Sequence, residues 1–119
     1  MDLNTFNDIA VIAGAELVLC KSAGRVASIE FHAGSLAACL DAPLLDVPRE
    51  FHLIGHSGEL ETFRARGAIV QVRDVLEAIQ AHELRTRSAD AHPDTRHIYF
   101  EGLERVRRHP DRFQIVWGS

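Results

Sequence analysis

Apolar residues recur along this chain with two different spacings, one typical of helices and one typical of strands. Residues Leu3, Phe6 and Ala10 are three or four positions apart, which predicts a helix over residues 3–14. The same spacing predicts a longer amphipathic helix over about 69–85. Shorter apolar runs with alternating positions predict strands over residues 16–21, 25–32, 50–55, 59–65, 98–103 and 113–117.

The segments between these elements are short and rich in turn-forming residues. Ser22–Gly24 predicts a hairpin connection, residues 34–41 are compatible with one or two helical turns, and the polar stretch 88–95 is expected to be a loop. Short connections favour antiparallel pairing. We therefore expect a single α+β domain over residues 1–119, with a mostly antiparallel sheet of about six strands and two main helices packed against one face.

The closing hairpin, from Ile98 to Trp117, is strongly apolar for a chain end. Chain ends fray unless the fold holds them, so we expect this hairpin to lie inside the sheet. Gly102 interrupts its first arm and predicts a β-bulge. Glu101 and Glu104 are three positions apart, so we expect them on opposite faces of the strand, and not as a general acid/base pair, unless the bulge re-aims them.

The composition is that of an ordinary globular protein, with 46% hydrophobic and 25% charged residues. No apolar run approaches the roughly 20 residues that cross a bilayer. The first residues lack the basic and hydrophobic regions of a secretion signal, so a cytoplasmic location without membrane attachment is expected. Cys20 and Cys39 are isolated in sequence, and we expect two buried thiols rather than a disulfide.

The net charge of −4 is unevenly distributed, since residues 1–60 carry −5 and residues 61–119 carry +1. Binding to nucleic acid without sequence preference requires a basic face, so this balance argues against direct contact with nucleic acid. An acidic surface on the first half would suit a basic partner. The turn of the closing hairpin holds arginines that we expect to be solvated, namely Arg105, Arg107, Arg108 and Arg112.

The most conspicuous short motif is Gly55–Gly58 (GHSG), which resembles the nucleophile elbow of the α/β-hydrolases. That motif needs a glycine where this chain has Glu59, and it needs a helix where the next residues alternate like a strand. A turn with a positive φ at Gly58 is therefore expected. The glycines form no phosphate-binding loop. We expect no catalytic residues, no cofactor and no enzymatic activity.

The chain has seven histidines, which raises the question of a metal site. Only His52 and His56 lie four apart, and a strand leading into a turn does not direct that spacing at one metal ion. His92 and His97 flank a loop but have no carboxylate or cysteine arranged as ligands. We therefore expect no bound metal.

Two segments of the closing hairpin, Ile98–Glu104 (IYFEGLE) and Ile115–Ser119 (IVWGS), combine a Phe-Glu-Gly-Leu core with a terminal Trp-Gly-Ser. In this the chain resembles small bacterial immunity proteins that neutralise polymorphic toxins, such as those of contact-dependent growth inhibition. The resemblance implies a small, cytoplasmic, non-enzymatic protein that binds a cognate toxin, such as a basic nuclease, and occludes its active site. It implies no particular binding residues.

Charge asymmetry provides the candidate contact residues for such a toxin. An acidic and aromatic patch would be attracted to a cationic active site and would speed the encounter. The acids of the N-terminal half are the candidates, chiefly Glu30, Asp41, Asp46, Glu50 and Glu59.

Two other classes of protein remain open. One is a small α+β enzyme or ligand-binding domain with a pocket between sheet and helix, lined by His32, His52 and Tyr99. The other is a structural subunit that pairs through a sheet edge and forms a homodimer. A polar pocket would favour the first of these, whereas an exposed acidic face would favour an immunity protein.

Overall fold

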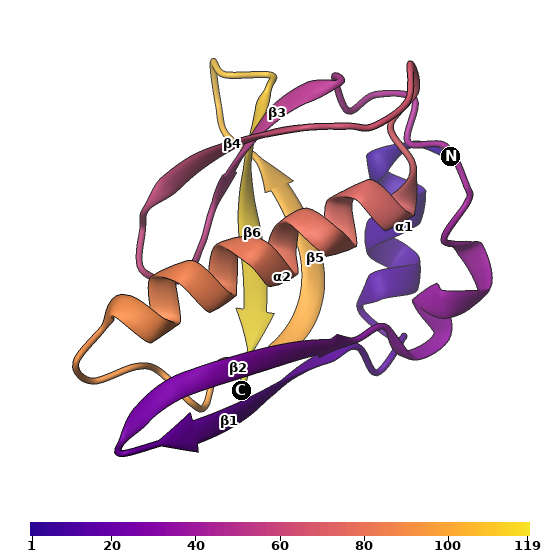
Figure 1. Cartoon of the computed structure of the whole chain (residues 1–119). Coiled ribbons are helices and arrows are strands. Elements are labelled where there is room, and N and C mark those ends of the chain that lie inside the picture. The colour runs from indigo at the N-terminus through magenta and orange to yellow at the C-terminus, as the bar shows by residue number, and fades with distance from the viewer.

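The computed structural model describes all residues, Met1–Ser119, and shows an α+β fold built on one six-stranded sheet (Figure 1). The expected fold class is confirmed. The helices are α1 (Leu3–Ala10) and α2 (Val72–Ala89), with a 3₁₀ segment η1 (Gly34–Cys39) between them. The strands are β1 (Glu16–Ser22), β2 (Arg25–His32), β3 (Glu50–Ile54), β4 (Leu60–Arg64), β5 (Tyr99–Arg105) and β6 (Arg112–Gly118).

The closing hairpin occupies the middle of the sheet, whose strand order is β2-β1-β5-β6-β3-β4. All neighbouring strands are antiparallel except β3 and β6, which are parallel. The parallel pair is possible because β4, α2 and β5 intervene and make a long crossover. The expectation of an interior hairpin is confirmed, and the sheet is mixed rather than purely antiparallel.

The sheet is curved into a half-barrel with α2 in its hollow. Figure 1 shows α2 crossing β5 and β6, with the β1–β2 hairpin on one side and β3–β4 on the other. Strands β1 and β5 are paired only at Glu16 and Tyr99, so the two halves of the sheet diverge from that point. The largest fully buried side chains of this core include Phe6, Phe51, Phe100 and Phe113.

Helix α2 begins and ends later than its apolar spacing predicts. At its start the Asp74 carboxylate accepts the backbone N–H of Gln71 at 2.9 Å, which caps the helix, and Ile69 lies outside it with 56% exposure. Beyond Ile79 the buried face of the helix becomes polar. The spacing of apolar residues could not predict the last turns of α2, because the residues buried there are polar: His82, Glu83, Thr86 and Arg87.

Helix α1 fills the space beside β5 where β1 diverges. The Asn7 amide accepts the Leu103 N–H at 2.9 Å and donates to the Leu103 carbonyl at 2.8 Å, so one side chain replaces a neighbouring strand. Gly102 lies at φ +125°, and a Cβ there would collide with the Asn7 side chain. The pairing of β5 with β6 shifts register between Phe100 and Gly102, which confirms the predicted bulge.

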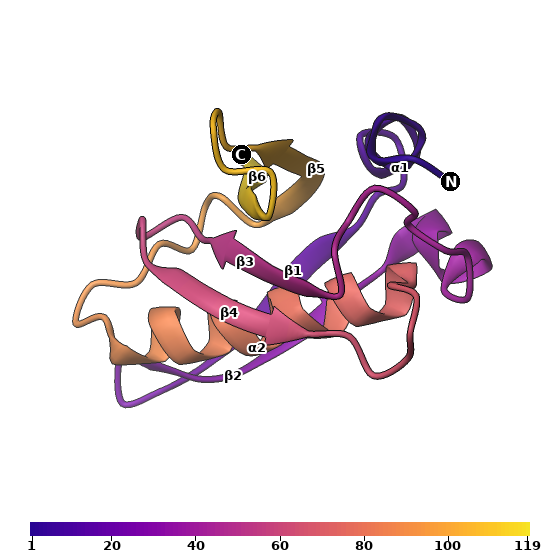
Figure 2. The same ribbon diagram turned by 90° about the horizontal axis from the view of Figure 1, so that it is seen from above.

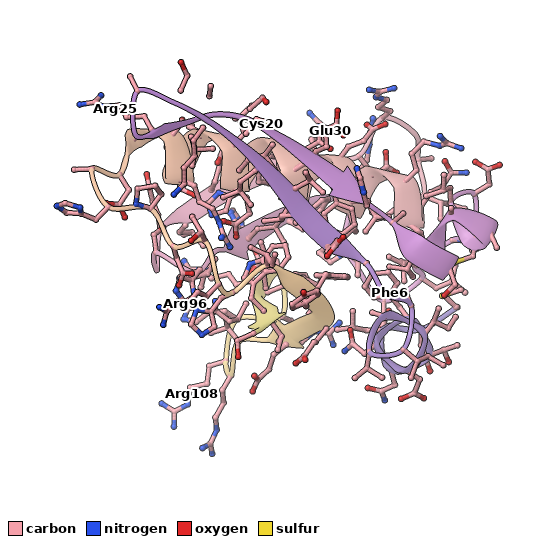
Figure 3. The ribbon with its side chains drawn as sticks, turned by 90° about the horizontal axis from the view of Figure 1, so that it is seen from below. Phe6, Cys20, Arg25, Glu30, Arg96 and Arg108 are labelled. Carbon is pink, nitrogen blue, oxygen red and sulfur yellow. The ribbon has the colours of Figure 1, made fainter.

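Several smaller expectations can be compared with the structure. The GHSG segment forms a turn between β3 and β4, with Gly58 at φ +81° as predicted. Of the arginines expected to be solvated, Arg105, Arg107 and Arg108 are exposed, and Arg108 projects away from the ribbon (Figure 3). Arg112 is half-buried at the start of β6. Two buried thiols were expected, and this is wrong, because Cys20 is exposed and Cys39 is only partly buried; both are free. No helix combines the length and the apolar character needed to span a membrane.

Candidate functional site

The convex side of the sheet, here called the outer face, carries no helix. Figure 2 shows α2 on the concave side, α1 beside β5, and nothing over the opposite side of β5 and β6. Strand register shows which residues lie on the outer face. Phe100 points into the core, so its neighbour Tyr99 points outwards, and Glu16 and Gly118, which are paired with Tyr99, lie on the same face. Its central part comprises Glu16, Val18, Tyr99, Glu101, Glu104, Gln114 and Val116.

Tyr99 is the aromatic residue of this surface. Its side chain is 46% exposed, and the nearby Val18 and Val116 are half-buried. Tyrosine is enriched among the residues that contribute most to protein–protein affinity, because it combines a large apolar area with a hydroxyl group. The outer face therefore has an apolar centre with an exposed aromatic side chain.

A groove of about 410 Å³ runs along the outer face between α1 and β5, and we call it the α1–β5 groove. Three carboxylates line it: Asp46 from the segment before β3, and Glu101 and Glu104 from β5. The other lining residues are Leu3, Asn4, Asn7, Leu103, Arg105 and Val116. The groove thus combines acidic groups with amides, next to the apolar centre that contains Tyr99.

The bulge at Gly102 is the reason that Glu101 and Glu104 share this groove. In a regular strand they would lie on opposite faces, but the extra residue shifts the alternation after Phe100. Leu103 therefore points into the core, and Glu104 joins Glu101, whose carboxylate lies over Gly118, on the outer face. Neither glutamate forms an ion pair. The single cation of the groove, Arg105, donates to the Asp46 carbonyl at 2.7 Å and lies 3.8 Å from the Asp46 carboxylate, so it offsets one of the three acids. The groove is therefore anionic.

The acids expected to bind a partner do not form one surface. Glu30 is on β2 and Glu59 precedes β4, so these two lie towards opposite edges of the sheet. Asp46 lines the α1–β5 groove, and Glu50 is exposed at the start of β3. Asp41 follows η1.

Four of the five expected acids already have a basic side chain beside them, and one of these is Asp46, which lies 3.8 Å from Arg105. Asp41 is 2.7 Å from the Arg73 guanidinium and Glu59 is 3.0 Å from Arg85. Glu30 is 3.1 Å from the His32 ring. Of the expected set, the structure brings only Asp46 together with other acids in a groove. The missed residues are Glu101 and Glu104, and the sequence signal that could have found them is the bulge predicted at Gly102.

The expected pocket residues His32, His52 and Tyr99 do not share a cavity. All three lie on the outer face rather than between sheet and helix, and none of the grooves of this protein is lined by any of them. The hollow between β2 and α2 is a mostly apolar groove of about 440 Å³. The placement of that pocket was therefore wrong.

The free edge of β2 is partly protected against pairing with another strand. The backbone N–H of Phe31 points away from β1 and donates to the Gln80 side chain of α2 at 3.0 Å. A side chain that occupies an edge donor in this way blocks the addition of a further strand at that point. This contact weighs against a homodimer built through β2.

A second cluster joins the turn after β3 to the loop after α2. His56 Nε2 and His97 Nδ1 each lie 2.6 Å from the same oxygen, Asp94 Oδ2, and the two imidazole rings are stacked with centroids 4.7 Å apart. The three ligand atoms all lie within 4.8 Å of one another. The expectation that His97 has no carboxylate nearby was wrong, because the loop folds back so that Asp94 faces it.

Asp94 is held in its ionised form by the loop itself. Partial burial opposes ionisation, but backbone N–H groups of His97 and Arg96 and the two imidazoles outweigh it and lower the pKa of Asp94 far below its ordinary value. The Oδ1 atom accepts the N–H of Arg96 at 2.7 Å and that of His97 at 3.0 Å. Oδ2 remains directed at the two imidazoles.

A buried ion pair positions that loop on α2. The Arg87 guanidinium donates to the Glu83 carboxylate at 2.9 Å, and their side chains are 5% and 1% exposed. The same guanidinium donates to the carbonyls of Asp94 and His97 at 2.8 and 2.7 Å. Trp117 Nε1 donates to Glu83 at 2.8 Å, which connects the network to the closing hairpin.

The neighbouring Glu61 on β4 predicts a measurable acid sensitivity. Burial opposes ionisation, yet hydrogen bonds from Arg85 and His82 of α2 outweigh it and hold the pKa of Glu61 below its usual 4.5. A carboxyl with a lowered folded-state pKa stabilises the fold above the unfolded pKa, and this contribution is lost as pH falls through the folded value. The stability difference between wild type and Glu61→Gln should therefore be largest near neutral pH and shrink below about pH 4.5.

Urea denaturation of both proteins from pH 7 to pH 3 measures this difference. Glu50→Gln is the control, because Glu50 is an exposed acid on the adjacent strand without an ion pair, and it should change stability little across the range. A wild-type to Glu61→Gln difference that stays constant down to pH 3 would contradict the prediction.

Comparison with known proteins finds no matching protein-family model, no matching curated protein and no matching solved structure.

Proposed function

We propose that this protein is an immunity protein that binds a cognate bacterial toxin with a basic active-site face and neutralises it by covering that face. The observation that carries the proposal is the α1–β5 groove, where Asp46, Glu101 and Glu104 lie beside the exposed Tyr99 on a sheet face without a helix. The proposed contact surface therefore contains only one of the acids chosen by charge asymmetry, Asp46.

The chemistry of the groove suits an arginine- or lysine-rich surface. The carboxylates of Glu101 and Glu104, which form no ion pair, would attract cations during the encounter, and charge complementarity can raise association rates by several orders of magnitude at low salt. Tyr99 and its apolar neighbours would supply the desolvated centre that such interfaces require. A toxin that cleaves nucleic acid must itself bind phosphates, so its active site offers the complementary charge.

The alternative of an enzyme receives less support from the geometry. Its expected pocket residues lie apart on the outer face, and the carboxylates of the α1–β5 groove lie in an open groove beside the sheet. An inhibitor of this kind would act in the cytoplasm, which is the location that we propose.

Charge reversal tests the proposal. The partner to be used is a toxin domain identified by co-purification with this protein from its native host. Glu101→Lys combined with Glu104→Lys should weaken its binding on the order of a hundredfold, mainly by slowing association, because two attractive contacts become repulsive. Surface plasmon resonance at two salt concentrations measures the rates, and the toxin's nuclease activity in the presence of each variant measures inhibition.

The control is Glu77→Lys combined with Asp90→Lys, which makes the same change in net charge on α2 and at its end. Glu77 takes part only in an exposed pair with Arg66, so little stability should be lost. Equal loss of affinity in both double variants would show that net charge alone acts. If the groove variant binds as tightly as wild type, the proposed surface is refuted. If wild type does not bind the toxin domain, the proposed function is refuted.

A further inference from the structure

We propose that His56, Asp94 and His97 form a binding site for a divalent transition metal, with Zn²⁺ as the expected ion. The site would connect the turn between β3 and β4 to the loop that follows α2. It lies at the C-terminal end of α2. Helix α1, whose residues line the α1–β5 groove, lies near the opposite end of α2 (Figure 1). The proposal therefore does not depend on the proposed function.

The first argument is convergence. Two imidazole nitrogens and one carboxylate oxygen, contributed by segments far apart in sequence, lie within 4.8 Å of one another. Metal–ligand bonds of about 2.0–2.2 Å place neighbouring ligand atoms roughly 3 Å apart. Small rotations of the half-exposed histidine side chains would bring their nitrogens from 2.6 Å to that distance from Asp94 Oδ2.

The second argument is the chemistry of the donor set. Neutral imidazole and carboxylate are ligands of zinc and of similar transition metals, whereas calcium and magnesium prefer sites made entirely of oxygen. Two neutral imidazoles and one carboxylate would give a donor set of net charge −1 for a divalent cation. Three protein ligands would leave at least one coordination position for water or a further ligand.

The third argument is orientation of the ligands by their surroundings. In metal sites the second oxygen of a carboxylate is commonly held by hydrogen bonds that direct the first one at the ion. Here Asp94 Oδ1 accepts two backbone N–H groups, and the backbone of Asp94 and His97 is held by the buried Arg87. On the other side Gly55 packs against His82 so closely that a Cβ would lie 2.6 Å from the His82 Nε2 atom. Both segments are therefore anchored on α2.

Titration of the protein with zinc tests the proposal. The protein is purified without a polyhistidine tag, stripped of metal with a chelator, and titrated with ZnCl₂ by isothermal titration calorimetry. We expect one Zn²⁺ per chain. His56→Ala and His97→Ala should each weaken binding by at least about tenfold to a hundredfold, since each removes a direct ligand. Zinc should also raise the thermal midpoint of wild type, because it binds the folded state and connects two loops.

His92→Ala is the matched control, because His92 lies in the same loop and its ring forms no contact with the cluster. This variant should bind zinc as wild type does. The His56 side chain is 40% exposed, pairs with Asp94 and stacks on His97, so its replacement should leave the protein folded, which circular dichroism verifies. The proposal is overturned if wild type takes up no stoichiometric zinc, if His56→Ala binds as tightly as wild type, or if His92→Ala loses as much affinity.

Discussion

Replacing Arg87 by methionine should lower the free energy of unfolding by about 3–5 kcal/mol, since it leaves the buried Glu83 carboxylate without its cation. Both side chains are almost completely buried, and after the substitution Glu83 would retain only the hydrogen bond from Trp117. The carbonyls of Asp94 and His97 would also lose their donors. Guanidinium chloride denaturation followed by tryptophan fluorescence measures the change, because Trp117 is the only tryptophan and contacts this pair.

Arg85→Met is the matched control for that experiment. Arg85 is two residues away on α2 and pairs with Glu59 and Glu61, but its side chain is 48% exposed. Exposed ion pairs contribute about 1 kcal/mol or less, so this variant should lose far less stability. The combination of Arg87→Met with Glu83→Leu should recover part of the loss, because no uncompensated charge remains. Equal losses for Arg87→Met and Arg85→Met would contradict the assigned role of the buried pair.

Gly102→Ala should destabilise the fold by about 3–5 kcal/mol, the sum of backbone strain and of lost hydrogen bonds. The strain arises because φ is +125° at this position. The added Cβ would collide with the Asn7 side chain, and the displaced amide could no longer bond to both the N–H and the carbonyl of Leu103. Urea denaturation measures the effect.

Two further variants separate the strain from the collision. Gly58→Ala introduces a Cβ at φ +81° into open space, so it should cost only the strain of about 1–2 kcal/mol. Asn7→Ala removes the group with which the new Cβ collides, so Asn7→Ala and Gly102→Ala combined should cost less than the sum of the two. If Gly102→Ala costs no more than Gly58→Ala, the contact between α1 and β5 does not have the role described here.

The α1–β5 groove illustrates what local rules can predict. Alternation along Ile98–Leu103 identified a strand, and Gly102 identified a bulge, because both depend on the conformations of a few consecutive residues. The same rules predicted that Glu101 and Glu104 would share a face only if Gly102 formed a bulge, and the structure contains that bulge. They could not predict that Asp46, from a distant segment, would join them.

The acids chosen by charge asymmetry show why counting charges along a chain does not define a surface. Glu30 and Glu59 belong to the same acidic half of the sequence, yet the sheet order sends them towards opposite edges. Arginines from the second half of the chain approach Asp41 and Glu59 and reduce the local charge. Net charge is a property of composition, whereas a patch depends on which strands become neighbours.

The sequence by itself determined the types and order of the elements, since these follow from the spacing of apolar residues and from turn-forming residues. It did not determine the parallel contact of β3 with β6 or the polar buried end of α2, which depend on contacts between distant segments. The convergence of His56 with Asp94 and His97 is of the same kind. Only the tertiary structure decided these three features. A buried polar side chain, for example, is favourable only when a hydrogen-bond or ion-pair partner from elsewhere in the chain lies beside it.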